Sequence, residues 1–564
     1  MIEEMPDSIG RYQFTHALLQ ETLMDELSLT RRVRLHARIA ESLEATYGED
    51  SEAHAAELAF HFEQAQSMVG TDKLVRYSML AGQKALDNSA FEDAMAHFQR
   101  GVEARQGQEM DDQLAELLVG YGRAGVSISD MVKTLKDYVP AMERAFDYYS
   151  SNGQTDRAVS VADFPHSTPV QMLMKETHRR ALELVPEGSH QAARLLSLYG
   201  YSLGVGEGLD LTQSRDAFER ALEIVRREGD GALEVRILSS YANILGFHLQ
   251  LDEALPMALE AIHREEETNN PVDMLRALLW ASNIYAYTGE FQQGETFADS
   301  MLSRAQSAGD LWWIGLATAA KMEAIASQGR LLEAVTLIKN ADPRLGDNLQ
   351  FQYRAVRILA QAGNLTDASD LVATITGGFG TLMSGGYNTI MAISSYLECS
   401  FDPGMTVDLV NKVNEWSSLR NIDINQHAEL GLRYGLAVFV TLREDKILGQ
   451  EQYSRISQLV RSGDVCAYGV SSQRVLGDLA KILEDNTRAE EHYQRSVKFC
   501  RGTGFKPELA WSLYEYADLL LTRDGDRDRE KAGPMLDEAL ALTTDMGMKP
   551  LMEKVLSKRE ILKA

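Results

Sequence analysis

The feature that most constrains this chain is a pattern of small residues that recurs every 40 positions. Steps of 40 in both directions from Ser214 reach seven positions in helix-like segments, called the anchors below: Ala94, Thr134, Met174, Ser214, Ala254, Gly294 and Ala334. Seven residues after each anchor stands a small residue, except at Met301, and the next residue is large and apolar, except at Asp342. Positions i and i+7 share one face of an α-helix. The pattern therefore predicts that the same type of helix is repeated along the chain.

The small residues indicate how these helices pack. A small residue on a helix face lets a neighbouring helix approach closely, and the large apolar residue beside it fills the remaining groove. One pair of helices cannot cover such a face, whereas stacking successive pairs does. The first complete pair, LVRYSMLAGQKAL followed by AFEDAMAHFQRGV between residues 74 and 102, is very close to the tetratricopeptide pattern. The sequence therefore predicts an all-α, tetratricopeptide-like helical-hairpin superhelix, or solenoid.

Composition limits the classes of function. The formal net charge of −27 and the pI near 4.9 repel phosphate backbones, so we expect no direct nucleic-acid or anionic-membrane partner. The cysteines Cys399, Cys466 and Cys500 have no CxxC spacing, which indicates neither a zinc site nor a disulfide framework. There is no signal-peptide pattern, and no apolar run approaches the ~18 residues of a membrane span. We expect a cytoplasmic protein with no cofactor and no metal.

Interruptions of the pattern divide the chain into four expected segments. Residues 1–66 precede the first hairpin, 72–376 carry the array with its period near 40, 377–386 form a glycine-rich hinge, and 387–564 form a second helical-repeat section with a C-terminal capping helix. The hinge is expected because five glycines fall within residues 377–386. Each glycine inside a helix costs about 0.5–1 kcal/mol relative to alanine.

The N-terminal stretch carries a family resemblance. RYQFTHALLQETLMDELSLTRRVRLHARIAESLEATYG (Arg11–Gly48) and HAAELAFHFEQA (His54–Ala65) are similar to the junction after the ATPase core of large signal-transduction ATPases. That family includes MalT-like and LuxR-type transcription regulators and cyclase-linked ATPases. Residues Gly504–Leu521 and Glu530–Leu556 are similar to the closing repeats of the family's sensor regions. The resemblance implies a small N-terminal helical or winged-helix remnant leading into a tetratricopeptide-like sensor superhelix.

Two departures from the family pattern bear on function. No GxxxxGK[ST] phosphate loop occurs in the 564 residues, so the family's nucleotide-binding core is missing. The chain also ends soon after its last repeat, which leaves no room for a helix-turn-helix reader. One interpretation is a noncatalytic interaction or sensor module that binds a peptide, a protein or an inducer in its concave groove. The alternative is a regulatory fragment of a multidomain ATPase or adenylate/guanylate cyclase whose catalytic part lies upstream. Neither makes this chain an enzyme.

His16 is the residue that the resemblance connects with a nucleotide. In these ATPases a winged-helix histidine can contact the phosphates of ADP, and FTHALLQE (Phe14–Glu21) is similar to that region. Because the nucleotide core is missing, this contact requires a partner ATPase in trans. A capping or packing role for His16 is the alternative.

The array itself supplies a second set of candidates. Arg236 and Asn243 precede the anchor Ala254 by 18 and 11 residues, and Arg276 and Asn283 precede the anchor Gly294 by the same intervals. First helices of tetratricopeptide hairpins line the concave groove, where an asparagine can hydrogen-bond a bound peptide and an aromatic residue such as Tyr285 adds contact area. Buried asparagines that bridge repeats are the alternative. The expected partner is a protein or peptide, from an ATPase, a cyclase or a transcription regulator.

Overall fold

The computed structural model describes residues 2–4, 12–14, 26–128, 133–164, 168–205, 208–268, 270–377, 386–400, 425–460, 465–525 and 527–563. In these ranges the only strands are β1 (Ile2–Glu4) and β2 (Tyr12–Phe14), which pair antiparallel with Ile2 opposite Phe14. All other regular elements are helical, so the all-α prediction is confirmed. The chain forms two compact units, Met1–Ser202 and Leu203–Ala564, called unit 1 and unit 2. Residues 378–385 lie outside the described ranges, and the hinge expected there stays a prediction.

Unit 1 is a run of short antiparallel helices. Its elements are α2 (Leu29–Tyr47), η1 (Gly48–His54), α3 (Ala55–Val69), α4 (Asp72–Asp87), α5 (Phe91–Ala104), α6 (Asp112–Val126), η2 (Thr134–Tyr138), α8 (Val139–Ser151), α9 (Thr155–Ala162), α10 (Thr168–Leu173), α11 (Lys175–Leu182) and most of α12 (His190–Val205). The ring of Phe98 on α5 fills the space left by Gly82 on α4 and Gly120 on α6, where a Cβ atom would lie 2.8 and 2.4 Å from the ring. Glycine is therefore required at both helix crossings.

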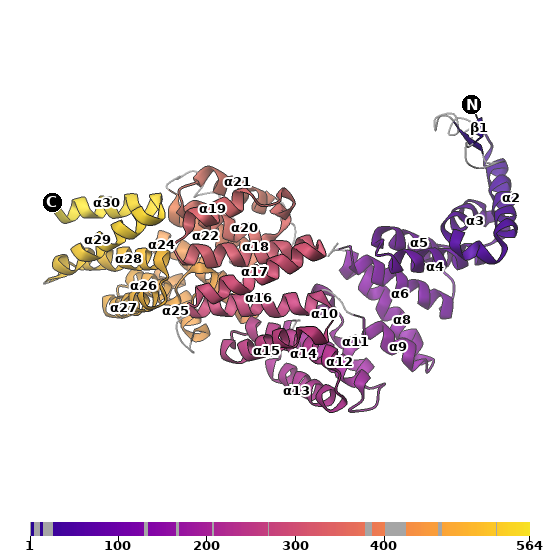
Figure 1. The fold of residues 1–564 in the computed structure, drawn as a ribbon, viewed down its shortest axis with the longest axis horizontal. Coiled ribbons are helices and arrows are strands. Elements are labelled where there is room, and N and C mark those ends of the chain that lie inside the picture. The colour runs from indigo at the N-terminus through magenta and orange to yellow at the C-terminus, as the bar shows by residue number, and fades with distance from the viewer. Residues whose placement is uncertain are drawn as a thin grey trace. The chain divides into compact units, whose positions relative to one another are not determined.

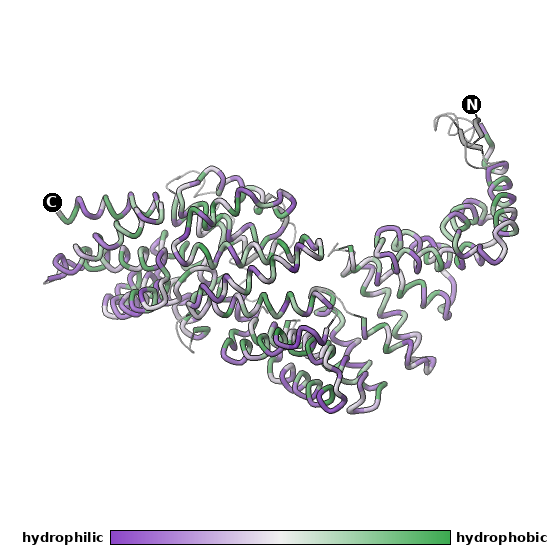
Figure 2. The backbone as a smooth tube through the Cα atoms, viewed as in Figure 1, coloured by the Kyte–Doolittle hydropathy of each residue, from purple (hydrophilic) through white to green (hydrophobic). Residues whose placement is uncertain are grey.

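Unit 2 contains the rest of the array. Its elements are α13 (Leu211–Glu228), α14 (Gly231–Phe247), α15 (Leu251–His263), η3 (Glu265–Glu267), α16 (Pro271–Thr288), α17 (Phe291–Ala308), α18 (Leu311–Ser327), α19 (Leu331–Lys339), η4 (Pro343–Asp347), α20 (Leu349–Gln361), α21 (Leu365–Gly377), α22 (Gly386–Cys399), α24 (Gln426–Arg443), α25 (Lys446–Leu459), η5 (Ala467–Gly469), α26 (Ser472–Ile482), α27 (Asn486–Thr503), α28 (Lys506–Arg523), α29 (Asp528–Met546) and α30 (Lys549–Lys563). Figure 1 shows these helices stacked in sequence order. Figure 2 shows hydrophilic and hydrophobic residues alternating along many of them, as in amphipathic helices.

Three helices in the regular part of unit 2 begin at a capping side chain. Asp230, Asn270 and Asp310 are the N-caps of α14, α16 and α18, and each side chain accepts a hydrogen bond from a backbone N–H of the first turn. Such caps satisfy donors that a helix leaves unpaired at its start. α13 and α17 end at Gly229 and Gly309, whose positive φ angles of 75° and 68° favour glycine.

The 40-residue pattern corresponds to burial. All seven anchors are buried, and each lies on or beside the second helix of a hairpin. Three later small residues that continue the pattern with altered spacing, Ala368, Ala489 and Ala532, are also fully buried, on α21, α27 and α29. The small anchors therefore mark the closest contacts between neighbouring hairpins, as the sequence predicts.

Unit 2 also packs on itself over long sequence separations. α18 contacts α28, α20 contacts α30, and the rings of Phe291 and Phe505 lie 4.9 Å apart. α14 packs against α24, and α16 packs against the segment around η5. Because of these contacts, unit 2 has one continuous core and is not held together by contacts between successive helices alone. In the described parts of the chain, no helix has both the length and the apolar character needed to cross a bilayer.

Candidate binding cavity between the first helices of the hairpins

A cavity of about 540 Å³ lies in unit 2 between α22, α24, α26, α28 and α30, and we call it the C-terminal cavity. α24, α26 and α28 are the first helices of three successive hairpins, so the cavity is on the side that a tetratricopeptide array presents to a ligand. Its lining is mixed: Met391, Val438 and Ile482 are apolar, whereas charged side chains line α26 and α28. The volume is typical of ligand pockets, which hold about 300–1,000 Å³.

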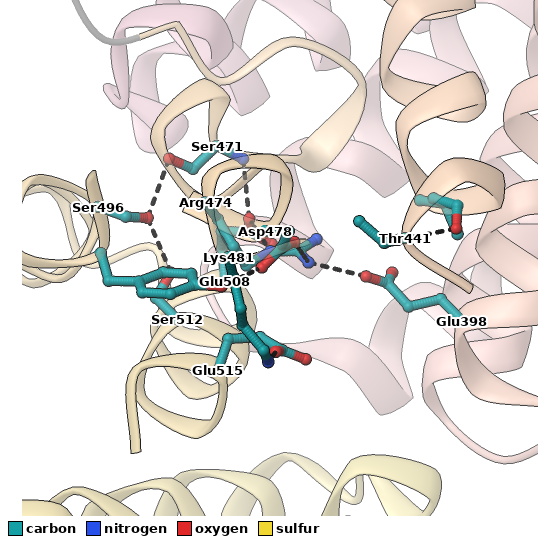
Figure 3. Close-up of polar contacts among 12 residues, drawn as sticks. Glu398, Thr441, Ser471, Arg474, Asp478, Lys481, Ser496, Glu508, Ser512 and Glu515 are labelled. Carbon is teal, nitrogen blue, oxygen red and sulfur yellow. Dashed lines mark hydrogen bonds and ion pairs between the residues drawn. The ribbon is translucent and has the colours of Figure 1, made fainter. Parts of the chain in front are cut away.

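Arg474 is the central cation of this cavity, and Figure 3 shows its contacts. Its Nε donates to Glu508 Oε1 at 2.6 Å, and its Nη1 donates to Glu398 Oε1 at 2.8 Å and to Asp478 Oδ2 at 3.2 Å. The Arg474 side chain is only 4% exposed. Glu508 Oε1 also accepts from the backbone N–H of Ser471 at 2.9 Å. Charged groups buried in this way are stable only when paired and hydrogen-bonded.

Lys481 forms a second charge cluster about two turns further along α26. Its Nζ donates to Glu515 Oε2 at 2.9 Å and to Asp518 Oδ2 at 2.6 Å. On α30, Lys558 pairs with Asp518, and Lys554 Nζ donates to the backbone oxygen of Glu398 at 2.8 Å. The two clusters meet at Asp478, beside Glu515.

Asp478 has an unusual ionisation. Burial raises the pKa of Asp478 to about 8, and the Glu515 carboxylate adds to the shift, whereas Arg474 and Lys481 oppose it. The Tyr493 hydroxyl donates to Asp478 Oδ1 at 2.7 Å and also favours the charged form. The raised pKa favours the protonated form of Asp478.

Trp511 and Tyr434 are the aromatic residues of the lining, and Trp511 is the larger. The Trp511 indole is 1% exposed, and its Nε1–H has no acceptor among the described residues. The Arg474 guanidinium and the Lys554 ammonium lie 5.6 and 5.1 Å from the ring centroid, within cation–π range. A buried indole N–H without an acceptor is uncommon, because buried donors are normally satisfied.

Nucleophiles near the cavity are not activated. The Ser496 hydroxyl lies 3.0 Å from the Ser471 hydroxyl and 2.8 Å from the Ser512 hydroxyl, as Figure 3 shows. Burial raises the pKa of the Cys399 thiol to about 12, which keeps it protonated. In the part of the chain that the structure describes, no group of three or more His, Cys, Asp or Glu side chains is placed to hold a metal ion.

The sequence offered a signal for these residues that the 40-residue pattern does not contain. Arg474, Asp478 and Lys481 are spaced i, i+4, i+7 on α26. On α28 the same kind of stripe comprises Glu508, Trp511, Glu515 and Asp518, spaced i, i+3, i+7, i+10. Stripes of opposite charge on the first helices of adjacent hairpins predict contact between them.

Unit 1 has a smaller cavity of about 450 Å³, between α4, α6, α8 and α9. Three arginines line it, but each has contacts. Arg157 pairs with Glu116 at 3.2 Å, Arg76 with Glu52 at 3.9 Å, and Arg123 Nη2 donates to the backbone oxygen of Ser160 at 2.6 Å. Each of these arginines therefore has a partner within the chain, as the cations of the C-terminal cavity do.

The candidates predicted on α14 and α16 lie outside both cavities. Arg236 Nε lies 3.5 Å from Asp273 Oδ2, and Arg276 Nη1 donates to Ser240 Oγ at 2.9 Å, so both arginines bridge adjacent hairpins. Asn243 is buried and Asn283 is half-buried. Their role in binding stays a prediction.

Tyr285, the fifth of these candidates, stacks on Phe297 of the neighbouring helix α17, with ring centroids 5.5 Å apart and planes 6° apart. His16 lies outside the described residues, and its contact with a nucleotide also stays a prediction.

Segments of the same chain occupy the inner face of α16 and α20. The Cys466 backbone N–H donates to the Tyr287 oxygen at 3.0 Å, and Arg357 Nη1 donates to the Gly469 oxygen at 3.1 Å. His427 lies 2.7 Å from the Tyr287 hydroxyl, and burial lowers the pKa of this histidine to about 3. These segments of the chain therefore cover this part of the inner face.

Together these features define a class: an all-α helical-hairpin repeat protein of the tetratricopeptide type, with a charged cavity between first helices. This fold class typically carries protein interactions rather than catalysis.

Comparison with known proteins adds little beyond the fold. No family model matches the chain, and no curated protein matches it either. Among solved structures, it is similar to the APC/C hetero-tetramer Cut9–Hcn1, with 12% identity, 96% of this chain and 99% of that chain covered, and a TM-score of 0.39. It is also similar to BtubC (BKLC) from P. vanneervenii, with 15% identity, 50% and 94% covered, and a TM-score of 0.26.

Proposed function

We propose that this chain is a noncatalytic protein-interaction module that holds an extended segment of a partner protein in the C-terminal cavity. The observation that carries the proposal is the cavity itself, between first helices, with its charged groups fixed by ion pairs. Fixed polar groups favour affinity because little side-chain freedom is lost on binding. The indole N–H of Trp511 is a donor that a peptide carbonyl would satisfy.

The class of partner is proposed from the resemblance of residues 11–65 to signal-transduction ATPases. On that basis the partner belongs to a cytoplasmic ATPase, cyclase or transcription-regulator system, and this chain senses or transmits its state. Arg236, Asn243, Arg276, Asn283 and Tyr285 remain candidates for a second contact with the same partner.

A site-specific cross-linker tests the proposal. A photoreactive phenylalanine analogue replaces Val438, which lines the cavity on α24, or the exposed Ile447 of α25 as the matched control. After irradiation in extract of the native cell, the Val438 probe is expected to form one discrete adduct that the Ile447 probe does not form. Ser395→Trp, which fills the cavity from α22, is expected to abolish it.

Identical adducts from the two positions, or an adduct that survives Ser395→Trp, would contradict the proposed site. The peptides recovered from the adduct also identify the partner. An ATPase, cyclase or regulator sequence supports the proposed system, and any other class of protein overturns that part alone.

A further inference from the structure

The charges in the C-terminal cavity do not balance. Among the described residues of its two clusters there are five carboxylates and four cations: Glu398, Asp478, Glu508, Glu515 and Asp518 against Arg474, Lys481, Lys554 and Lys558. At the rim Lys446 pairs with Glu484 at 2.6 Å, while Glu444 lines the opening as a further carboxylate. With all of these groups ionised, the two clusters would carry one negative charge in excess.

An uncompensated carboxylate is costly in a buried site, where charge interactions are stronger than in water. The free protein avoids this cost by keeping a proton on Asp478. A cationic group in the cavity would remove the same excess without the proton. An anionic group would increase it, so the site selects by the sign of charge.

Trp511 supplies an independent feature that indicates a ligand. Its side chain lines the cavity, and its N–H is buried and lacks an acceptor among the described residues. A cation alone would not satisfy this donor, whereas a peptide offers carbonyl oxygens along its backbone. A peptide with a basic side chain would both neutralise the carboxylates and supply an acceptor for the indole N–H.

Resting on the function proposed above, we infer that the segment held in the C-terminal cavity presents an arginine or lysine side chain to Asp478 and Glu515 and a backbone carbonyl to the indole N–H of Trp511. The cationic head pairs with the two carboxylates, and the apolar stem lies against Val438 and Ile482.

Binding is then linked to a proton. Asp478 gives up its proton to solvent as the ligand cation takes the place of that proton, so each bound cation releases one H⁺. The groups that act on Asp478 are Arg474 and Lys481 on its own helix, Tyr493 on α27 and Glu515 on α28. Glu398 on α22 and Lys554 on α30 line the same cavity. At a pH below the pKa of Asp478, which is near 8, the proton must be removed from Asp478 before the cation can bind, and the cost of removing it lowers the affinity. Affinity is therefore expected to rise about tenfold per pH unit up to that pH and then level off.

A random 12-residue peptide library displayed on phage, selected against the full chain at pH 8.5, tests the inference. The peptides retained by wild type and lost with Ser395→Trp are expected to share one arginine or lysine. Replacing that residue by neutral citrulline or glutamine in a synthetic copy is expected to weaken binding at least about tenfold. Isothermal titration measures the affinity between pH 6 and 9.

Asp478→Asn is the decisive variant, because asparagine keeps the shape and can still accept from Tyr493 but cannot ionise. It is expected to weaken binding at pH 8.5 and to abolish the rise in affinity between pH 6 and 8. Asp216→Asn, on the exposed face of α13, is the matched control and should behave as wild type.

Cavity-dependent peptides without a basic residue, or an unchanged pH dependence in Asp478→Asn, would overturn this inference and leave the proposed function standing. If no selected peptide depends on the cavity, both fail.

Discussion

Replacing Arg474 by alanine is expected to lower the free energy of unfolding of unit 2 by about 3–5 kcal/mol. The guanidinium is the cation shared by Glu398, Asp478 and Glu508, and its removal leaves the buried Glu508 without an opposite charge. Urea unfolding followed by tryptophan fluorescence measures the loss in unit 2, because all five tryptophans lie in residues 203–564. The loss is expected to shrink as pH falls from 8 to 5, since the uncompensated carboxyls then take up protons.

Arg488→Ala is the matched control for this result. Arg488 lies on the neighbouring helix α27, its side chain is 61% exposed, and it makes one ion pair of 3.3 Å with Asp485. Exposed pairs of this kind contribute little, so its effect should stay within about 0.5 kcal/mol. Equal effects of the two substitutions would mean that the Arg474 cluster does not hold the first helices together.

Replacing Trp280 by alanine is expected to cost a similar amount, about 3–5 kcal/mol, for a different physical reason. The indole is 2% exposed and lies edge-on to Phe247 and His427, with centroids 5.2 and 5.9 Å away. It fills the space beside Gly246, where a Cβ atom would lie 2.1 Å from the ring. Its N–H has no partner in the described part of the chain, so the loss is one of packing.

Trp312→Ala separates packing from a general effect of removing tryptophan. Trp312 lies in the first turn of α18 and is 58% exposed. Its removal should change the urea midpoint little, within about 0.5 kcal/mol. If Trp280→Ala were equally mild, the contact of α14 and α16 with α24 would not contribute to the stability of unit 2.

The repeated helices could be predicted from sequence because their signals are local. An anchor such as Ala254 and its partner Ala261 are seven residues apart, and the caps Asp230 and Asp310 act within one turn. These features depend only on helix geometry and on backbone groups nearby. They fix the class of fold and the position of most hairpins between residues 211 and 341.

The cavity could not be predicted in the same way, because it depends on distant segments. Glu398 and Arg474 are 76 residues apart, and Tyr287 and His427 are 140 apart. No periodicity in sequence indicates how far an array turns before its helices meet again. The candidates on α14 and α16 followed from the spacing of the anchors, whereas the charge stripes of α26 and α28 lie where that spacing is altered.

The central claim is that the first helices of the hairpins in unit 2 hold a peptide. Hydrogen–deuterium exchange of the full chain, with and without a cavity-dependent peptide from the library, tests it most directly. The account predicts slower exchange in α24, α26 and α28, and unchanged exchange in their partners α25, α27 and α29. Slower exchange confined to α25, α27 and α29 would contradict it.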